Sequence, residues 1–93
     1  MKSEFETKLI AEGYTCHTWS NAAGFWYPVH EHAYHKMIVV LEGSITFYLP
    51  ADKQEVVLKK GDKLEIPSNT EHSATVGPQG VTCLEGQLLR AKE

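Results

Sequence analysis

Cysteine is scarce in this sequence: Cys16 and Cys83 are the only two among 93 residues. They stand 67 positions apart, so they form neither a disulfide framework nor a CxxC motif of the kind that binds metals or catalyses redox reactions. We therefore expect both to be reduced residues of the core.

Long apolar runs are also lacking. The longest, residues 37–41, has five residues, whereas a helix that crosses a bilayer needs roughly 20. The start of the chain carries Lys2, Glu4 and Glu6 and has no apolar stretch of the kind that a secretion signal requires. These absences predict a cytoplasmic protein that does not interact with a membrane.

Basic residues are neither abundant nor clustered. There are 9 lysines and arginines against 12 aspartates and glutamates, which gives a formal net charge of −3. The chain therefore lacks the basic patch that is typical of proteins that bind phosphate backbones. We expect no nucleic-acid partner, and a small-molecule ligand fits this composition better.

What the sequence does contain is a globular composition in a short chain. Hydrophobic residues make up 42% and charged residues 23%, a balance typical of folded chains. Residues 1–93 are expected to form a single domain. Because so small a domain buries only about 60–65% of its unfolded surface, we expect a homodimer to provide additional stability.

The residue pattern predicts an all-β fold with one short helix. Ser3 and Glu6 form a capping-box pattern and Gly13 provides a stop, so a helix is expected over residues 4–12. From about residue 14 to 90 the period becomes twofold, with turn signals between short segments. The predicted strands cover residues 14–20, 25–32, 36–41, 44–49, 55–58, 63–66, 73–76 and 81–89. Such a succession is typical of a sandwich or a small jelly-roll barrel.

Histidine is the residue type that stands out. Four of the five histidines are candidate metal ligands, namely His30, His32, His35 and His72. Alternate residues of a strand share a face, so the rings of His30 and His32 point the same way, as two neighbouring metal ligands must. His72 lies 40 positions after His32 and can complete the set only through the fold. Neutral imidazole is a favoured ligand for Zn, Fe, Ni and Cu.

Two spaced motifs in this chain resemble those of the cupins. The first cupin motif is glycine, five residues, HxH, three or four residues, glutamate, six residues and glycine. The corresponding positions here are Gly24, His30, His32, Lys36 and Gly43. The second motif is glycine, five residues, PxG, two residues, histidine, three residues and asparagine. Its positions here are Gly61, Pro67, Asn69, His72 and Val76.

The resemblance implies a double-stranded β-helix, the jelly-roll barrel of the cupins, which is often dimeric. It further implies a divalent metal, such as Zn, Fe, Ni, Mn or Cu, bound by the two HxH histidines, the motif-one glutamate and the motif-two histidine. Cupins include dioxygenases, isomerases, decarboxylases, sugar-binding sensor domains and metal-free storage proteins. Membership of the family therefore says little about the reaction.

Lys36 is the main departure from the family pattern, because it replaces the glutamate ligand by a cation that repels a metal unless it deprotonates or points away. Three interpretations remain open. The lysine points inward and holds an anionic substrate, points inward in a metal-free site, or is carried outward by a β-bulge. Such a bulge would swing His35 inward as a fourth ligand, whereas strict alternation turns His35 away.

The aromatic run before the HxH pair includes Trp26, which we predict to line the ligand pocket or a dimer face, with core and edge packing as the alternative. Residues 37–41 are apolar on both faces, so a second sheet, a partner subunit or the N-terminal helix must cover them.

Together these features predict a small metal-binding cupin whose interior pocket takes a small polar ligand and supports chemistry of the dioxygenase or isomerase type. The predicted metal ligands are His30, His32 and His72, with His35 as a candidate fourth, and Lys36 and Trp26 are predicted to line the pocket. The alternative is a non-catalytic small-molecule-binding or sensor module with a degenerate or metal-free site.

Overall fold

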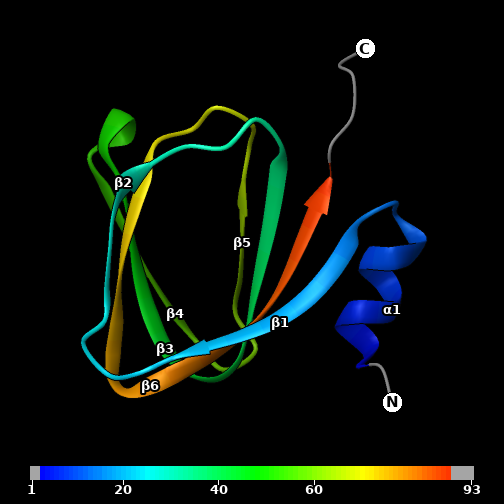
Figure 1. Cartoon of the computed structure of the whole chain (residues 1–93), viewed down its shortest axis with the longest axis horizontal. Helices are drawn as coiled ribbons and strands as arrows, with labels where there is room; N and C mark the ends of the chain where they lie inside the picture. The colour runs from blue at the N-terminus through cyan, green and yellow to red at the C-terminus, as the bar shows by residue number, and fades with distance from the viewer. Residues whose placement is uncertain (1–2, 89–93) are drawn as a thin grey trace.

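Two long antiparallel strands organise the computed structural model, which describes residues 3–88 (Figure 1). In chain order the elements are α1 (Glu4–Ala11), β1 (Thr15–Asn21), β2 (Trp26–His30), β3 (His35–Leu49), a short 3₁₀ helix (Pro50–Asp52), β4 (Gln54–Lys59), β5 (Lys63–Ile66) and β6 (His72–Leu88). The predicted all-β fold with one short helix is confirmed. Within residues 3–88 no helix is long and apolar enough to cross a membrane.

The helix α1 begins where its cap predicts, since the Ser3 hydroxyl accepts a hydrogen bond of 3.1 Å from the backbone N–H of Glu6. It ends at Ala11, one residue earlier than expected. Leu9 is buried against Val39 and Leu84 on the outer face of the sheet. The helix therefore covers the outward side of the apolar segment 37–41 from within the same chain.

Strands β3 and β6 each replace two of the predicted strands. Residues 36–41 and 44–49 are parts of one 15-residue strand, and residues 73–76 and 81–88 are parts of one 17-residue strand. The expected turns at Glu42 and Gly43 and at residues 77–80 are bends inside these strands, and the β3–β6 register shifts around Glu42 and Gly43. Residues 89 and 90 of the predicted barrel lie outside the described residues.

The six described strands form one sheet that curls into the barrel seen end-on in Figure 1. Its order is β1-β6-β3-β4, while β2 also pairs with β6 and β5 with β3. Val40 and Ile45 lie on opposite sides of the register shifts and both belong to the inner core. Without the shifts, residues five apart would face opposite sides of the sheet. The bulges therefore keep one apolar face turned inward along the whole length of β3.

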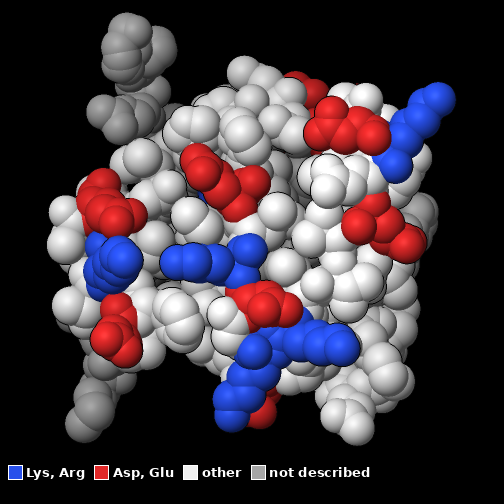
Figure 2. Space-filling model, turned by 180° about the vertical axis from the view of Figure 1, so that it is seen from behind, with Lys and Arg blue, Asp and Glu red and all other residues white. Residues whose placement is uncertain are grey.

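Charged side chains lie on the outside with their signs mixed. Figure 2 shows acidic and basic residues interspersed on the face seen from behind the view of Figure 1, without an extended patch of either sign. This face therefore presents no continuous basic surface.

Alanine substitution at Gly43 measures how much the close approach of β3 and β6 at the bend contributes to stability. It has φ +77°, and a Cβ there would overlap the carbonyl oxygen of Gly80, whereas Gly24 has the same φ with nothing within 4 Å of a Cβ. We expect Gly24→Ala to lower the free energy of unfolding by roughly 1–2 kcal/mol, the cost of left-handed backbone. Gly43→Ala should cost a further 1–3 kcal/mol or so, because the two backbones must also separate. Urea unfolding of both variants measures the difference, and equal losses would show that the close approach contributes nothing.

Candidate metal centre

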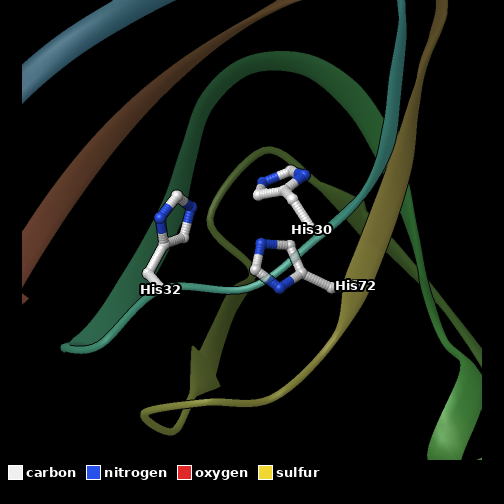
Figure 3. Close-up of side chains that lie close together, drawn as sticks. All are labelled: His30, His32 and His72. Atoms are coloured by element: carbon white, nitrogen blue, oxygen red, sulfur yellow. The ribbon is translucent and has the colours of Figure 1, made fainter.

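Three histidines from two strands and a loop converge at one end of the sheet. His30 ends β2 and pairs directly with His72, the first residue of β6, while His32 follows β2. One ring nitrogen of each lies within 4.8 Å of the corresponding nitrogens of the other two. The ring centroids of His30 and His72 are 4.4 Å apart, and Figure 3 shows the three side chains pointing toward one another. The pairing of β2 with β6 thus brings together His32 and His72, which lie 40 positions apart in the sequence.

Backbone carbonyls fix the orientation of two of these rings. Nδ1 of His30 lies 2.6 Å from the carbonyl oxygen of Pro28, and Nδ1 of His72 lies 2.9 Å from that of Thr70. A carbonyl oxygen can only accept, so each Nδ1 carries the proton and donates it. Each Nε2 is left with a lone pair. Metal-binding histidines are typically oriented in this way by their second ring nitrogen.

His72 is the most buried of the three, with 1% of its surface exposed. Within the described residues its Nε2 is buried and has no hydrogen-bond partner. Burial is the largest cause that lowers the pKa of His72, to about 4, and the charges of His30, Lys36 and His32 lower the pKa further against the bond to Thr70. The ring is therefore neutral at pH 7, with its lone pair available to a ligand.

The pKa of His32 is lowered by similar causes. Burial lowers its pKa most, followed by the charges of Lys36 and His30, while Glu85 opposes the shift. Its ring stacks on Tyr34 with centroids 4.9 Å apart. Neutral imidazoles with free lone pairs are the donors that divalent transition metals prefer, so these residues fit a metal ion of this class.

A cavity of about 320 Å³ lies beside the three histidines. It is at the small end of the range of roughly 300–1,000 Å³ that is typical of small-molecule sites. Apolar and aromatic side chains dominate its wall, with a few polar groups. The lining residues are Trp19, Asn21, Tyr27, His30, His32, Tyr34, Lys36, Ile38, Ile45, Phe47, His72, Ala74 and Glu85.

Lys36 points inward, as strict alternation requires. Its side chain is buried and lines the cavity, with Nζ 3.8 Å from Oε2 of Glu85. Burial lowers the pKa of Lys36, and the charge of Glu85 opposes that shift. The interpretation in which a bulge carries the lysine outward is therefore wrong, because the β3–β6 register runs without a shift from His35↔Leu88 to Val40↔Cys83.

His35 does not join the other three histidines. Without a bulge at this point its ring stays on the face opposite Lys36, where Nδ1 accepts a hydrogen bond of 3.2 Å from the backbone N–H of Ser68. The group of potential ligands within residues 3–88 consists of His30, His32 and His72.

Trp26 lies outside the cavity, contrary to the prediction of a pocket residue. It is 60% exposed and pairs with Thr75, while its neighbour Tyr27 faces inward and lines the cavity. Trp19 of β1 supplies the indole that we expected from Trp26. Alternation along β2 explains why Tyr27 faces the cavity and Trp26 does not, since only one of two successive residues in a strand faces the interior.

Glu85, like its partner Trp19, is a cavity residue that sequence reasoning missed. Its Oε1 accepts a hydrogen bond of 2.9 Å from Nε1 of Trp19, and its Oε2 accepts one of 2.8 Å from Nε2 of Gln87. The available signal was the single acidic residue of the segment 72–88, two positions after Cys83 and therefore on the same face as that predicted core residue. A carboxylate is rarely buried without partners.

The family now follows from both geometry and sequence. Residues 17–85 match the family model described as a cupin domain. The chain belongs to the cupins. No curated protein matches the sequence.

Solved structures agree with this fold. A cupin superfamily protein from Desulfitobacterium hafniense is 21% identical, with a TM-score of 0.73, over 83% of this chain and 68% of that one. An RmlC-like cupin from Shewanella frigidimarina is 22% identical, with a TM-score of 0.72, over 85% and 68% of the two chains. The polyketide cyclase RemF from Streptomyces resistomycificus is 24% identical, with a TM-score of 0.73, over 87% and 60%. At these identities the likeness shows the fold.

The neutral state of His72 predicts a pH dependence of stability in metal-free protein. The unfolded chain binds a proton on this ring below pH 6.5, whereas the folded protein does so only near pH 4. The stability from the neutral ring is thus present at pH 7 and is lost as the pH falls from 6.5 towards 4, by about 3 kcal/mol. Urea unfolding in chelator should show this slope in wild type, a shallower slope in His72→Gln, and no change in His17→Gln, whose ring is exposed. Equal slopes in wild type and His72→Gln would contradict the prediction.

Proposed function

We propose that this cupin holds one divalent transition metal through His30, His32 and His72 and binds a small polar ligand in the adjoining cavity. The observation that carries the proposal is Nε2 of His72, which is buried without a partner and belongs to the group of three converging nitrogens. A buried polar atom left without a partner costs about 1–3 kcal/mol. A metal ion bound to this nitrogen would remove that cost.

The protein supplies orientation and shielding around the metal. The carbonyls of Pro28 and Thr70 hold two rings with Nε2 free. Side chains such as Phe47 and Ile45 give the cavity an apolar wall that limits the access of water. Three protein donors leave coordination positions open for a ligand. A bound metal supplies Lewis-acid chemistry, which polarises an oxygen atom of the ligand.

Two forms of this function differ in whether a reaction follows binding. The catalytic form is of the dioxygenase or isomerase type, and the presence of the polyketide cyclase RemF among the structural neighbours supports a reaction in a barrel of this shape. The non-catalytic form is a binding or sensor module. It is favoured by Glu85, the one carboxylate among the described lining residues, because hydrogen bonds from Trp19 and Gln87 occupy both of its oxygens. A carboxylate so engaged is a poor group for moving a proton.

Metal analysis of three single variants tests the proposal. After purification without chelator, the wild type should contain about one metal ion per chain, and His30→Ala and His72→Ala should lose it. His35→Ala is the matched control and should keep the metal, because His35 lies outside the group. Chelator should lower the melting temperature of the wild type by about 10–20 °C, since a metal at a hundred times its Kd stabilises the fold by about 2.7 kcal/mol. Wild-type protein that contains no metal and gains no thermal stability from added Zn²⁺, Ni²⁺ or Mn²⁺ would overturn the proposal.

A further inference from the structure

The cavity contains a cation whose hydrogen-bonding capacity is unused. Lys36 is 8% exposed and lines the cavity, and its Nζ lies 3.8 Å from Oε2 of Glu85, too far for a hydrogen bond. Within residues 3–88 the ammonium has no hydrogen-bond acceptor. It therefore presents three donors to the cavity.

The carboxylate of Glu85 is fixed by other groups. Trp19 donates to Oε1 and Gln87 donates to Oε2, so the carboxylate is held beside Lys36 and balances its charge. Glu85 is thus a positioning residue for the lysine. The ammonium keeps its donors for a ligand.

The net charge of the cavity favours an anion. A histidine binds a metal as neutral imidazole, and Lys36 and Glu85 form an ion pair whose charges cancel. A divalent metal would therefore leave a charge of about +2 in a largely apolar cavity. In the usual cupin site the motif-one glutamate would offset part of this charge, and here that position is a lysine. A ligand with a negative group supplies the missing charge.

We propose that the ligand is a small organic carboxylate with an apolar body, selected by Lys36 together with the metal. This proposal rests on the proposed function for the metal but not for the lysine. The carboxylate accepts hydrogen bonds from Nζ of Lys36, and the apolar body packs against the aliphatic and aromatic wall formed by Ile38, Ile45 and Phe47. Lys36 is thereby the residue that determines the charge of the ligand.

Matched acids and amides test this selection by calorimetric titration. Isobutyrate and benzoate are compared with isobutyramide and benzamide, on protein loaded with Zn²⁺ and on metal-free protein. Lys36→Met/Glu85→Gln removes both charges while the new amide oxygen still accepts from Trp19, so no unpaired charge is buried. Lys60→Met is the control, because its side chain is 73% exposed.

The acids should bind wild type and Lys60→Met more tightly than the amides do, and the double variant should lose roughly tenfold or more of its affinity for the acids alone. Equal affinity of the double variant and the wild type for the acids would overturn the proposal, as would wild type that prefers the amides or binds no acid at millimolar concentration. Elemental analysis of each sample shows whether metal is bound, so a failure of the proposed metal site is distinguished from a failure of the proposed selection by Lys36. If no metal binds, the lysine-dependent preference is still measured on metal-free protein.

A second observation, on the opposite side of the sheet, concerns assembly. The register places Trp26, Thr75, Thr46 and Val57 in one row across β2, β6, β3 and β4. The row carries no charge, and its end residues Trp26 and Val57 are 60% and 54% exposed. Helix α1 covers the other wall of the barrel and lies at the right in Figure 1, while β2 lies at the left. This row therefore forms an uncharged strip, apolar at its two ends, that no described element covers.

The charges beside this row are self-complementary. On β4, Glu55 and Lys59 face outward on either side of Val57, with partners Tyr48 and Ser44 on β3. A two-fold axis along the row would reverse β4 relative to its copy. Each Glu55 would then face Lys59 of the partner subunit, and Val57 would meet Val57 of the partner subunit.

We infer that this outer face packs against the same face of a second copy. An isologous contact of this kind places the exposed Trp26 against Trp26 of the partner subunit and joins opposite charges at both ends of the β4 segment. The homodimer expected from the chain length thereby acquires a specific surface.

Charge reversal tests this orientation by sedimentation velocity at micromolar concentration. Glu55→Lys and Lys59→Glu should each weaken the dimer by roughly tenfold, and the double variant should restore it, because the opposite charges face each other again. Trp26→Ser should weaken it in all backgrounds, and Glu12→Lys, at the end of α1, serves as the control. A monomeric wild type would overturn the inference, and so would a dimer that is indifferent to both single reversals and to Trp26→Ser.

Discussion

The antiparallel pairing of β3 with β6 is the constraint on which the rest of the structure depends. The two strands run side by side from His35↔Leu88 to Tyr48↔Ser73, and every other described strand pairs with one of them. Both strands bend at the same place, so the single sheet folds into two walls that face each other across the interior of the barrel. The register of this one pairing therefore decides which side chains reach the interior on both walls.

The site is a consequence of that register. The start of β3 meets the end of β6, which brings Lys36 beside Glu85 on one wall. The start of β6 meets the end of β2, which brings His72 beside His30 on the other wall. Neither pair is close in sequence. The barrel thus places an ion pair and a set of imidazoles around the same cavity, and their chemistry is coupled because the charge of Lys36 lowers the pKa of both His32 and His72.

The sequence predicted the features that depend on local pattern. The cap at Ser3 and the all-β class follow from residue types and alternation, and strict alternation favoured the inward direction of Lys36 among the three interpretations that were open. The joined strands did not, because a glycine with positive φ serves a hairpin turn and a bulge equally well. At Gly43 the choice is made by the partner strand, whose Gly80 carbonyl leaves no room for a Cβ. Glu85 and Trp19 were missed for a similar reason, since their hydrogen bond joins residues 66 positions apart.

The lysine at position 36 changes the electrostatics of the site without removing its capacity for a metal. The metal affinity of imidazole depends on a free lone pair, which the carbonyls of Pro28 and Thr70 secure on two rings irrespective of residue 36. Repulsion by a lysine is limited by a carboxylate that lies beside it, and here Glu85 is 3.8 Å away and is held by two further donors. What the substitution removes is a permanent anionic ligand. In the proposed function, the negative charge that a divalent ion needs would then arrive with the ligand, and lysine in place of glutamate would act first on which molecule binds and only second on whether a metal does.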